Sequence, residues 1–384
     1  VQHYLADCAG RFPTMLGQVR TKIQQSALQA SYAQQPLGMA ETNKKIIVIG
    51  ASAGGMQALT RLLAKLPESL EASVFIVLHL SSDSSSAFLA KRLGQFTTLS
   101  CKVVEHLKPI EPGTVYMAQA DMQLLLKENV MLVTRGPREN QFRPSIDTLF
   151  RSAAAYHGAN TTGVILTGFM TDGVVGMEHI KRSGGITVVQ SPADAEFPVL
   201  PQNVLQKVEV DHVVTLDEMG ELLADLVKRG SSSARAVPSD IWQEAQIAER
   251  IMTNSNMSSI EDLENAGQRT QYTCPECGGS LWEISQPGTM KRYRCHSGHA
   301  FNQSSLLHSM NDALEETLWV ALRNLEERRN IMLHISQSDS DSGRKRWASM
   351  QEDRAEEMKV HIERLRELLA RVSHADDDPI EEAG

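Results

Sequence analysis

Between Lys44 and about Lys228, short apolar runs alternate with stretches in which apolar residues recur at helical spacing. The apolar runs predict buried strands at residues 45–49, 73–78, 163–167, 186–190 and 211–214. The stretches between them predict amphipathic helices at residues 55–66, 84–94, 146–158, 173–183 and 217–228. Buried strands separated by helices of this length are typical of a parallel sheet with helices on both faces. The pattern therefore predicts an α/β fold with a doubly wound, mostly parallel sheet.

The spacing changes between Cys101 and Val133. Strand-like runs follow one another here with tight connections, as "CKVVEH", "GTVYMA", "MQLLLKE" and "VMLVTR". Strands joined this closely pair most readily as antiparallel neighbours. We expect an antiparallel insertion in the sheet, or at its edge.

The rest of the chain divides by composition. The run Gly230-Ser-Ser-Ser-Ala has the composition of a linker, and Ser239 is a candidate N-cap for a helix that follows it. Two further helices are expected at about 308–335 and 344–373, separated by "SQSDSDSG". The expected parts are a leader (1–38), an α/β domain (39–230), a linker with a helix (231–270), a cysteine-bearing module (271–305), a helical hairpin (306–374) and an acidic, disordered tail (375–384).

Charge and hydropathy exclude several classes of protein. The formal net charge is −9, which argues against a nucleic-acid partner bound through phosphate contacts. From Gln351 onward there are 11 acidic and 5 basic residues, so much of that charge belongs to the tail. No apolar stretch reaches the ~20 residues of a membrane-spanning helix, and the N-terminus lacks a signal-peptide pattern. These features predict a cytoplasmic protein with no membrane insertion.

The Gly-rich turn after the first strand, "GASAGG", allows two interpretations. A strand, a Gly-rich turn and a helix can bind phosphate at the helix N-terminus. However, the dinucleotide motif G-x-G-x-x-G requires glycine where Ser52 stands, the P-loop lysine is missing, and His79 rather than an acidic residue follows the next strand. The same turn fits G-x-S-x-G, a strained turn that projects a nucleophilic serine.

Two other strand ends supply partners for Ser52. A serine hydroxyl needs a base to accept its proton, and His79 lies just past the second predicted strand. Asp172 lies in the Gly-rich turn after the strand "GVILTG" and could orient the imidazole. Each residue alone has a structural explanation, as part of a tight turn, as a strand-end histidine or as a helix N-cap. Because the carboxyl ends of parallel strands meet at one edge, the three together favour a Ser52–His79–Asp172 triad.

Six segments between about Lys44 and Lys228 carry a further signal: "IGASAGG", "LHLSSDSSSAFLAKRL", "IEPGTVYMAQADMQLLL", "RPSIDTLFRSAA", "GVILTGFMTDGVVGM" and "SGGITVVQ". Together they resemble the catalytic domain of the CheB-type chemotaxis protein-glutamate methylesterases. The resemblance implies a serine hydrolase that removes methyl esters from glutamyl side chains of chemoreceptors, usually with glutamine deamidation. It implies the same triad, no cofactor for catalysis, and a backbone N–H near Phe169 in the oxyanion hole.

The chain also departs from that family. Ala53 replaces a common threonine, and Phe169 and Met170 make the turn before Asp172 bulkier. The 38 residues of the leader are too few for the receiver domain that usually precedes the catalytic domain. We therefore keep a second hypothesis, a catalytically weak scaffold that binds a signalling partner. Arg143 has two explanations, a contact to a substrate carboxylate or carbonyl, or an ion pair near a helix start.

The cysteines predict a metal site. Cys8 and Cys101 stand alone, but Cys274-x2-Cys277 is followed after 17 residues by Cys295-x3-His299. This spacing is typical of structural zinc sites in small ribbon-like modules, in which metal binding supplies the folding energy. His296 is a rival fourth ligand, but its adjacency to Cys295 favours His299. The last two helices carry apolar residues at helical spacing, which indicates packing between them or, alternatively, dimerisation or partner docking.

Overall fold

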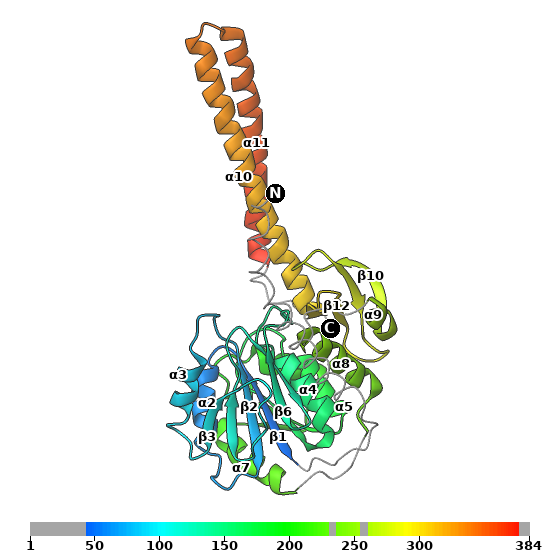
Figure 1. Cartoon of the computed structure of the whole chain (residues 1–384). Helices are drawn as coiled ribbons and strands as arrows, with labels where there is room; N and C mark the ends of the chain where they lie inside the picture. The colour runs from blue at the N-terminus through cyan, green and yellow to red at the C-terminus, as the bar shows by residue number, and fades with distance from the viewer. Residues whose placement is uncertain (1–43, 230–235, 254–259, 376–384) are drawn as a thin grey trace, which may run out of the picture. The chain divides into compact units, whose positions relative to one another are not determined.

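The computed structural model describes residues 44–229, 236–253 and 260–375 (Figure 1). The expected leader and all but the first residue of the expected acidic tail lie outside these residues. None of the described helices is long and apolar enough to cross a membrane.

A seven-stranded sheet forms the centre of the main domain, and all of its described pairings are parallel. Across the sheet the strands are β3 (Ser100–Val103), β4 (Thr114–Met117), β2 (Ala72–Leu78), β1 (Lys45–Ala51), β7 (Thr161–Ile165), β8 (Ile186–Gln190) and β9 (His212–Val214). The helices of the domain are α2 (Gly55–Leu63), α3 (Ser86–Leu93), α4 (Ile146–His157), the short 3-10 helix η1 (Gly158–Asn160), α5 (Val174–Arg182), α6 (Val199–Lys207) and α7 (Leu216–Arg229).

Strand β1 shows why both faces of the sheet are covered. Its residues are apolar without alternation, and successive side chains of a strand point to opposite faces. Ile46 and Val48 pack in the core that contains α4, α5 and α6, whereas Ile47 and Ile49 pack in the core that contains α2, α3 and α7. The prediction of a doubly wound parallel sheet is confirmed.

Two features of the main domain, one in the sheet and one a helix, differ from expectation. The runs at β3 and β4 are parallel members of the main sheet, so only β5 (Gln123–Lys127) and β6 (Val130–Thr134) form the expected antiparallel insertion. The pattern gave no sign of α6, because prolines interrupt its first turn. Pro198 is its N-cap residue and Pro201 lies in its first turn, where a backbone N–H has no intrahelical partner to lose.

The segment expected as a linker contains structure that belongs to the main domain. Helix α8 (Ser239–Thr253) packs along α4, and its residues Ile241 and Ala245 are fully or almost fully buried in the core of the domain. Helix α9 (Ile260–Ala266) follows and packs against α8.

The cysteine-bearing segment forms a four-stranded antiparallel sheet, which we call the ribbon. Its strands are β10 (Gln268–Thr273), β11 (Ser280–Glu283), β12 (Arg292–Cys295) and β13 (Ala300–Asn302). Helices α10 (Gln303–Asp341) and α11 (Lys345–Ala375) then lie side by side (Figure 1). Leu322, Ile362 and Leu369 pack between them. Helix α10 continues through most of the Ser/Asp run expected to interrupt it, and the chain turns only at residues 342–344.

Candidate active site and metal centre

Ser52 lies where β1 turns into α2. Its backbone N–H donates to the carbonyl of Thr167, 3.1 Å away, which joins the ends of β1 and β7. Gly54, the N-cap residue of α2, adopts a left-handed conformation (φ 71°), so the chain reverses sharply after the serine. The positive end of α2 therefore lies beside the Ser52 hydroxyl.

His79 follows β2 and contacts both of its predicted partners. Its Nδ1 lies 3.3 Å from Ser52 Oγ, and its Nε2 lies 2.8 Å from Asp172 Oδ2. An ionised carboxylate only accepts hydrogen bonds, so Nε2 carries the proton and Nδ1 presents a lone pair to the serine hydroxyl. The imidazole stacks on the ring of Phe142, with 3.6 Å between ring centroids and 4° between planes. This stacking fixes the plane of the imidazole.

Asp172 is held by the N-terminus of α4. Its Oδ2 accepts from the backbone N–H of Ile146 at 2.6 Å, and its Oδ1 accepts from the Ser145 hydroxyl at 2.8 Å and the N–H of Asp147 at 3.2 Å. The side chain is completely buried. The carboxylate thus satisfies backbone donors at the positive end of a helix, which stabilises its charge and fixes its position.

A second buried carboxylate lies beside Asp172. Asp147 accepts hydrogen bonds from the N–H groups of Gly173 and Gly176, and the amide of Asn140 donates to both carboxylates, at 2.7 Å to Asp147 and 2.9 Å to Asp172. Burial, followed by the charge of Asp172, raises the pKa of Asp147 well above its usual range. Asn140 therefore bridges two carboxylates that would otherwise repel each other.

Sequence reasoning missed Asn140, Phe142 and Ser145. Asn140 and Phe142 lie where no apolar period or chemical motif distinguishes them, whereas Ser145 directly precedes the predicted helix at 146–158, as its N-cap residue. A signal was present only in the segment "RPSID", which drew attention to Arg143.

The predicted oxyanion residue Phe169 lies two residues after Thr167, whose carbonyl accepts from the Ser52 N–H. Its side chain is exposed and packs against Phe197, with 4.8 Å between ring centroids. The preceding residue, Gly168, is so close to Ser52 that a Cβ on it would lie 2.7 Å from Ser52 Cβ. The backbone just before Phe169 is therefore in close contact with Ser52.

Arg143 is committed to an ion pair. Its guanidinium donates to Asp121 Oδ1 at 2.8 and 2.5 Å and to the carbonyl of Gly136 at 2.9 Å. The same contact lowers the pKa of Asp121. Of the two explanations of Arg143, this geometry favours the ion pair, although Asp121 precedes β5 and does not lie at a helix start.

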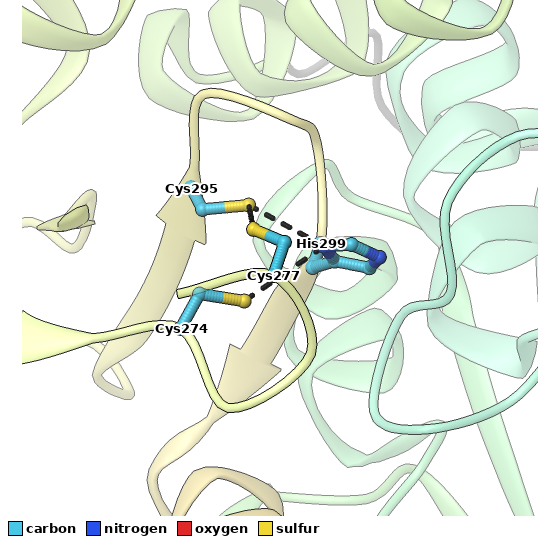
Figure 2. Close-up of side chains that lie close together, drawn as sticks. All are labelled: Cys274, Cys277, Cys295 and His299. Carbon is cyan, nitrogen blue, oxygen red and sulfur yellow. Dashed lines mark hydrogen bonds between the residues drawn. The ribbon is translucent and has the colours of Figure 1, made fainter. Parts of the chain in front are cut away.

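The four metal-ligand candidates also come together (Figure 2). Their ligand atoms all lie within 4.8 Å of one another, with 3.7 Å from Cys277 Sγ to Cys295 Sγ and 3.5 Å from Cys295 Sγ to His299 Nδ1. A tetrahedral ion with bonds of about 2.3 Å to sulfur and about 2.0 Å to nitrogen separates its ligands by roughly 3.5–3.8 Å. These separations fit a metal ion, and His299 rather than His296 completes the set.

The thiols of this cluster are electrostatically coupled. The hydrogen bond with Cys274 lowers the pKa of Cys295 to about 3, against the effect of burial, and His299 contributes in the same direction. A thiolate is the form that binds a metal. Four protein ligands would close the coordination sphere, which is typical of a structural metal site.

The chemistry available at the first site follows from its geometry. A serine hydroxyl faces the lone pair of an imidazole, a buried carboxylate orients that imidazole, and a helix N-terminus lies beside the serine. Such a site can transfer the serine proton and stabilise an oxyanion. The doubly wound fold and this arrangement are those of an α/β serine hydrolase.

Comparison with known proteins identifies the family. The family described as CheB methylesterase matches residues 47–223. A protein of Leptospira interrogans, provisionally named protein-glutamate methylesterase/protein-glutamine glutaminase, is 36% identical over 185 residues, which are 48% of this chain and 95% of that protein. This chain belongs to the CheB methylesterase family.

Other relatives match the same part of the chain. The protein-glutamate methylesterase/protein-glutamine glutaminase of Photorhabdus laumondii is 33% identical over 195 residues, or 50% of this chain and 55% of that protein. The crystal structure of the Thermotoga maritima CheB methylesterase catalytic domain is 29% identical, covers 48% of this chain and 98% of that domain, and has a TM-score of 0.46. The family match ends at residue 223, before α8, the ribbon and the helical hairpin.

Proposed function

We propose that this enzyme hydrolyses methyl esters of glutamyl side chains on chemoreceptors or a related signalling protein, with Ser52, His79 and Asp172 as its catalytic residues. The observation that carries the proposal is the continuous chain of contacts from Ser52 Oγ through the His79 ring to Asp172. Catalysis belongs in this proposal to the α/β domain (39–230), and the ribbon and the hairpin are accessory parts.

In the first half of the reaction, Ser52 Oγ attacks the ester carbonyl carbon while His79 Nδ1 accepts the hydroxyl proton. The negative charge of the tetrahedral intermediate develops beside the N-terminus of α2 and the backbone near Phe169, which we propose as oxyanion donors. The intermediate collapses, the bond from carbon to the methoxy oxygen breaks, and His79 returns the proton so that methanol leaves. An acyl ester between Ser52 and the glutamyl side chain remains.

In the second half, His79 accepts a proton from water, whose oxygen attacks the acyl carbon. Collapse of this intermediate releases the glutamate side chain and returns the proton to Ser52. A glutamine side chain would follow the same route with ammonia as the leaving group, so the proposal includes deamidation. Asp172 keeps the Nε2 proton in place and stabilises the charged imidazole in both halves.

We also propose that the ribbon holds a zinc ion through Cys274, Cys277, Cys295 and His299. The ion would act structurally, because four protein ligands leave no position open for substrate. The proposal includes a reducing compartment, the cytoplasm, because thiol ligands must stay reduced. Metal analysis of the purified protein tests it: one zinc per chain is expected, and Cys277→Ser should lose it.

The test of the esterase is methanol release from a methylated receptor fragment. Ser52→Ala should lower turnover by about 10⁴-fold or more, because it removes the nucleophile. The matched control is Ser100→Ala, since Ser100 is exposed at the amino end of β3, the end opposite the site. Turnover that survives in Ser52→Ala would contradict the assignment of the nucleophile. No methanol from the wild-type protein, with Ser52 also inert to a fluorophosphonate probe, would contradict the esterase itself.

A further inference from the structure

Asn140 connects the ribbon to the carboxylate of Asp172. Its side chain is buried, and its Nδ2 donates to both Asp172 and Asp147. Its backbone has φ 50°, a left-handed conformation in which asparagine is one of the more tolerated residues. The Asp172 carboxylate thus depends on Asn140 for one of its donors.

The ribbon and the start of α10 fix the orientation of this amide. Asn140 Oδ1 accepts from the backbone N–H of Asn302 at 2.9 Å and from the Ser305 hydroxyl at 2.8 Å. The backbone N–H of Asn140 donates to the carbonyl of Ala300 at 2.8 Å. Because two donors occupy Oδ1, Nδ2 must face the two carboxylates.

Asn302 makes a second connection, to the residue before Asp172. Its Nδ2 donates to Thr171 Oγ1 at 3.0 Å and to the Thr171 carbonyl at 3.3 Å. Its Oδ1 meanwhile accepts from the N–H of Ser305 and caps α10. One ribbon residue therefore contacts both Asn140, which donates to Asp172, and Thr171, which precedes Asp172 in the chain.

These ribbon residues directly follow a metal ligand. Strand β13 begins at Ala300, the residue after His299, and contains Asn302. The apolar core around the cysteines is small: Cys274, Leu281, Tyr293, Cys295, Phe301 and Leu306. A module of this size depends on its metal to fold. Loss of the metal would therefore release the strand that orients Asn140.

We propose that Asn140 is a positioning residue for Asp172 and that the metal-bound ribbon sets its position, so that metal occupancy of the ribbon controls the reactivity of Ser52. The inference rests on the proposed esterase function. The ribbon thereby acts on catalysis without contacting substrate. Thiol oxidation or chelation would lower catalysis through the same route, since both remove the metal.

The first experiment measures the rate at which a fluorophosphonate probe labels Ser52, because that rate reports activation of the serine without a receptor substrate. Cys277→Ser, which removes a metal ligand, should label about 10- to 100-fold more slowly than the metal-loaded wild type, the loss expected from misplacing a catalytic group by about 1 Å. Cys101→Ser is the matched control, because Cys101 is a free thiol on β3, outside the metal cluster. Its labelling rate should equal that of the wild type.

The second readout is the far-downfield NMR resonance of the proton shared by His79 and Asp172. It should be present in the metal-loaded wild type and absent in Cys277→Ser. Metal loss that leaves both this resonance and the labelling rate unchanged would overturn the inference while the esterase stands. A metal-loaded wild type that neither labels nor releases methanol would overturn the proposed function, and the inference with it.

Two variants test the connection itself without removing the metal. Asn140→Gly suits the positive φ and deletes only the amide, so labelling should slow 10- to 100-fold with the metal retained. Asn302→Asp keeps an acceptor for the N-terminus of α10 and for the Thr171 hydroxyl but loses the two bonds that Nδ2 donates to Thr171, so kcat should fall severalfold with KM unchanged. Asn324→Asp, on an exposed face of α10, is the control. Wild-type rates in Asn302→Asp and in every folded Asn140 variant would overturn the inference.

Discussion

Gly168 packs so closely against Ser52 that there is no space for a side chain at this position. A Cβ at this position would lie 2.7 Å from Ser52 Cβ and 3.2 Å from Ser52 N. Both contacts are to atoms near the backbone, which cannot move away as the end of a long side chain can. The turn that presents Ser52 therefore requires glycine opposite it.

At the residue scale we predict that Gly168→Ala lowers the rate of Ser52 labelling by about 10- to 100-fold, because the added methyl group displaces the nucleophile by up to about 1 Å. The fluorophosphonate assay measures the effect. Gly94→Ala is the matched control, since a Cβ there would meet its nearest atom at an ordinary 3.5 Å. Equal labelling by the two variants would contradict this account of the turn.

Arg143 and Asn140 show what residue-level reasoning could and could not predict. The sequence drew attention to Arg143, and the structure shows it paired with Asp121, 22 residues away. Nothing in the sequence drew attention to Asn140, whose partner Asn302 lies 162 residues away. Hydrogen bonds between residues so far apart leave no periodic pattern in a single sequence.

Helix α4 is the element that connects the site to the core. Its N-terminus holds Asp172, and its body packs against the sheet on one side and α8 on another. His157 ends the helix, and its ring nitrogens are buried with no hydrogen-bond partner among the described residues. Burial, followed by the charge of Lys44, lowers the pKa of His157 to about 4.

At the element scale we predict that His157 contributes to acid sensitivity. The ordinary pKa of 6.5 applies to the unfolded chain, so between about pH 6.5 and 4 the unfolded state binds a proton that the folded state does not. The stability of the fold with a neutral His157 is fully present above pH 6.5. As the pH falls through this window, the free energy of unfolding decreases by up to about 3 kcal/mol. The midpoint of urea unfolding should therefore fall less between pH 7 and pH 5 in His157→Leu than in the wild type.

The control for this prediction is His334→Leu, because His334 is exposed on α10. That variant should keep the pH dependence of the wild type. An equally steep loss of stability in His157→Leu would show that other groups cause the acid sensitivity.

At the scale of the whole molecule, buried ion pairs join the ribbon to the main domain. Arg294 on β12 donates to Glu139 at 2.9 Å, Arg151 on α4 donates to the same carboxylate at 2.8 Å, and Arg292 approaches Glu244 of α8 at 2.8 Å. Burial would raise the pKa of Glu139, but the charges of Arg151 and Arg294 outweigh it and the pKa is lowered. The ribbon thus contacts the main domain through buried groups of opposite charge, each of which stabilises the charge of its partner.

At the scale of the whole molecule we predict that Arg294→Met weakens the docking of the ribbon by about 3–5 kcal/mol, because Glu139 would stay buried with one partner fewer. Hydrogen exchange of the β12 and β13 amides measures the loss. Arg366→Met, which breaks an exposed pair with Glu326, should cost less than about 1 kcal/mol. Protection of β13 that is unchanged in Arg294→Met would contradict the role of this network.

The sequence by itself determined most elements of the main domain and the chemical groups of both sites. Apolar runs such as Ile46–Ile49 predict strands buried on both faces, because consecutive side chains point to opposite faces of a sheet and all of these are apolar. Parallel topology then places Ser52, His79 and Asp172 at one edge, and the cysteine spacing predicts which side chains converge in the ribbon. The tertiary structure alone decided that β3 and β4 run parallel in the main sheet and that Asn140 joins the ribbon to Asp172. Such pairings depend on three-dimensional proximity between distant segments, which local propensity and periodicity do not encode.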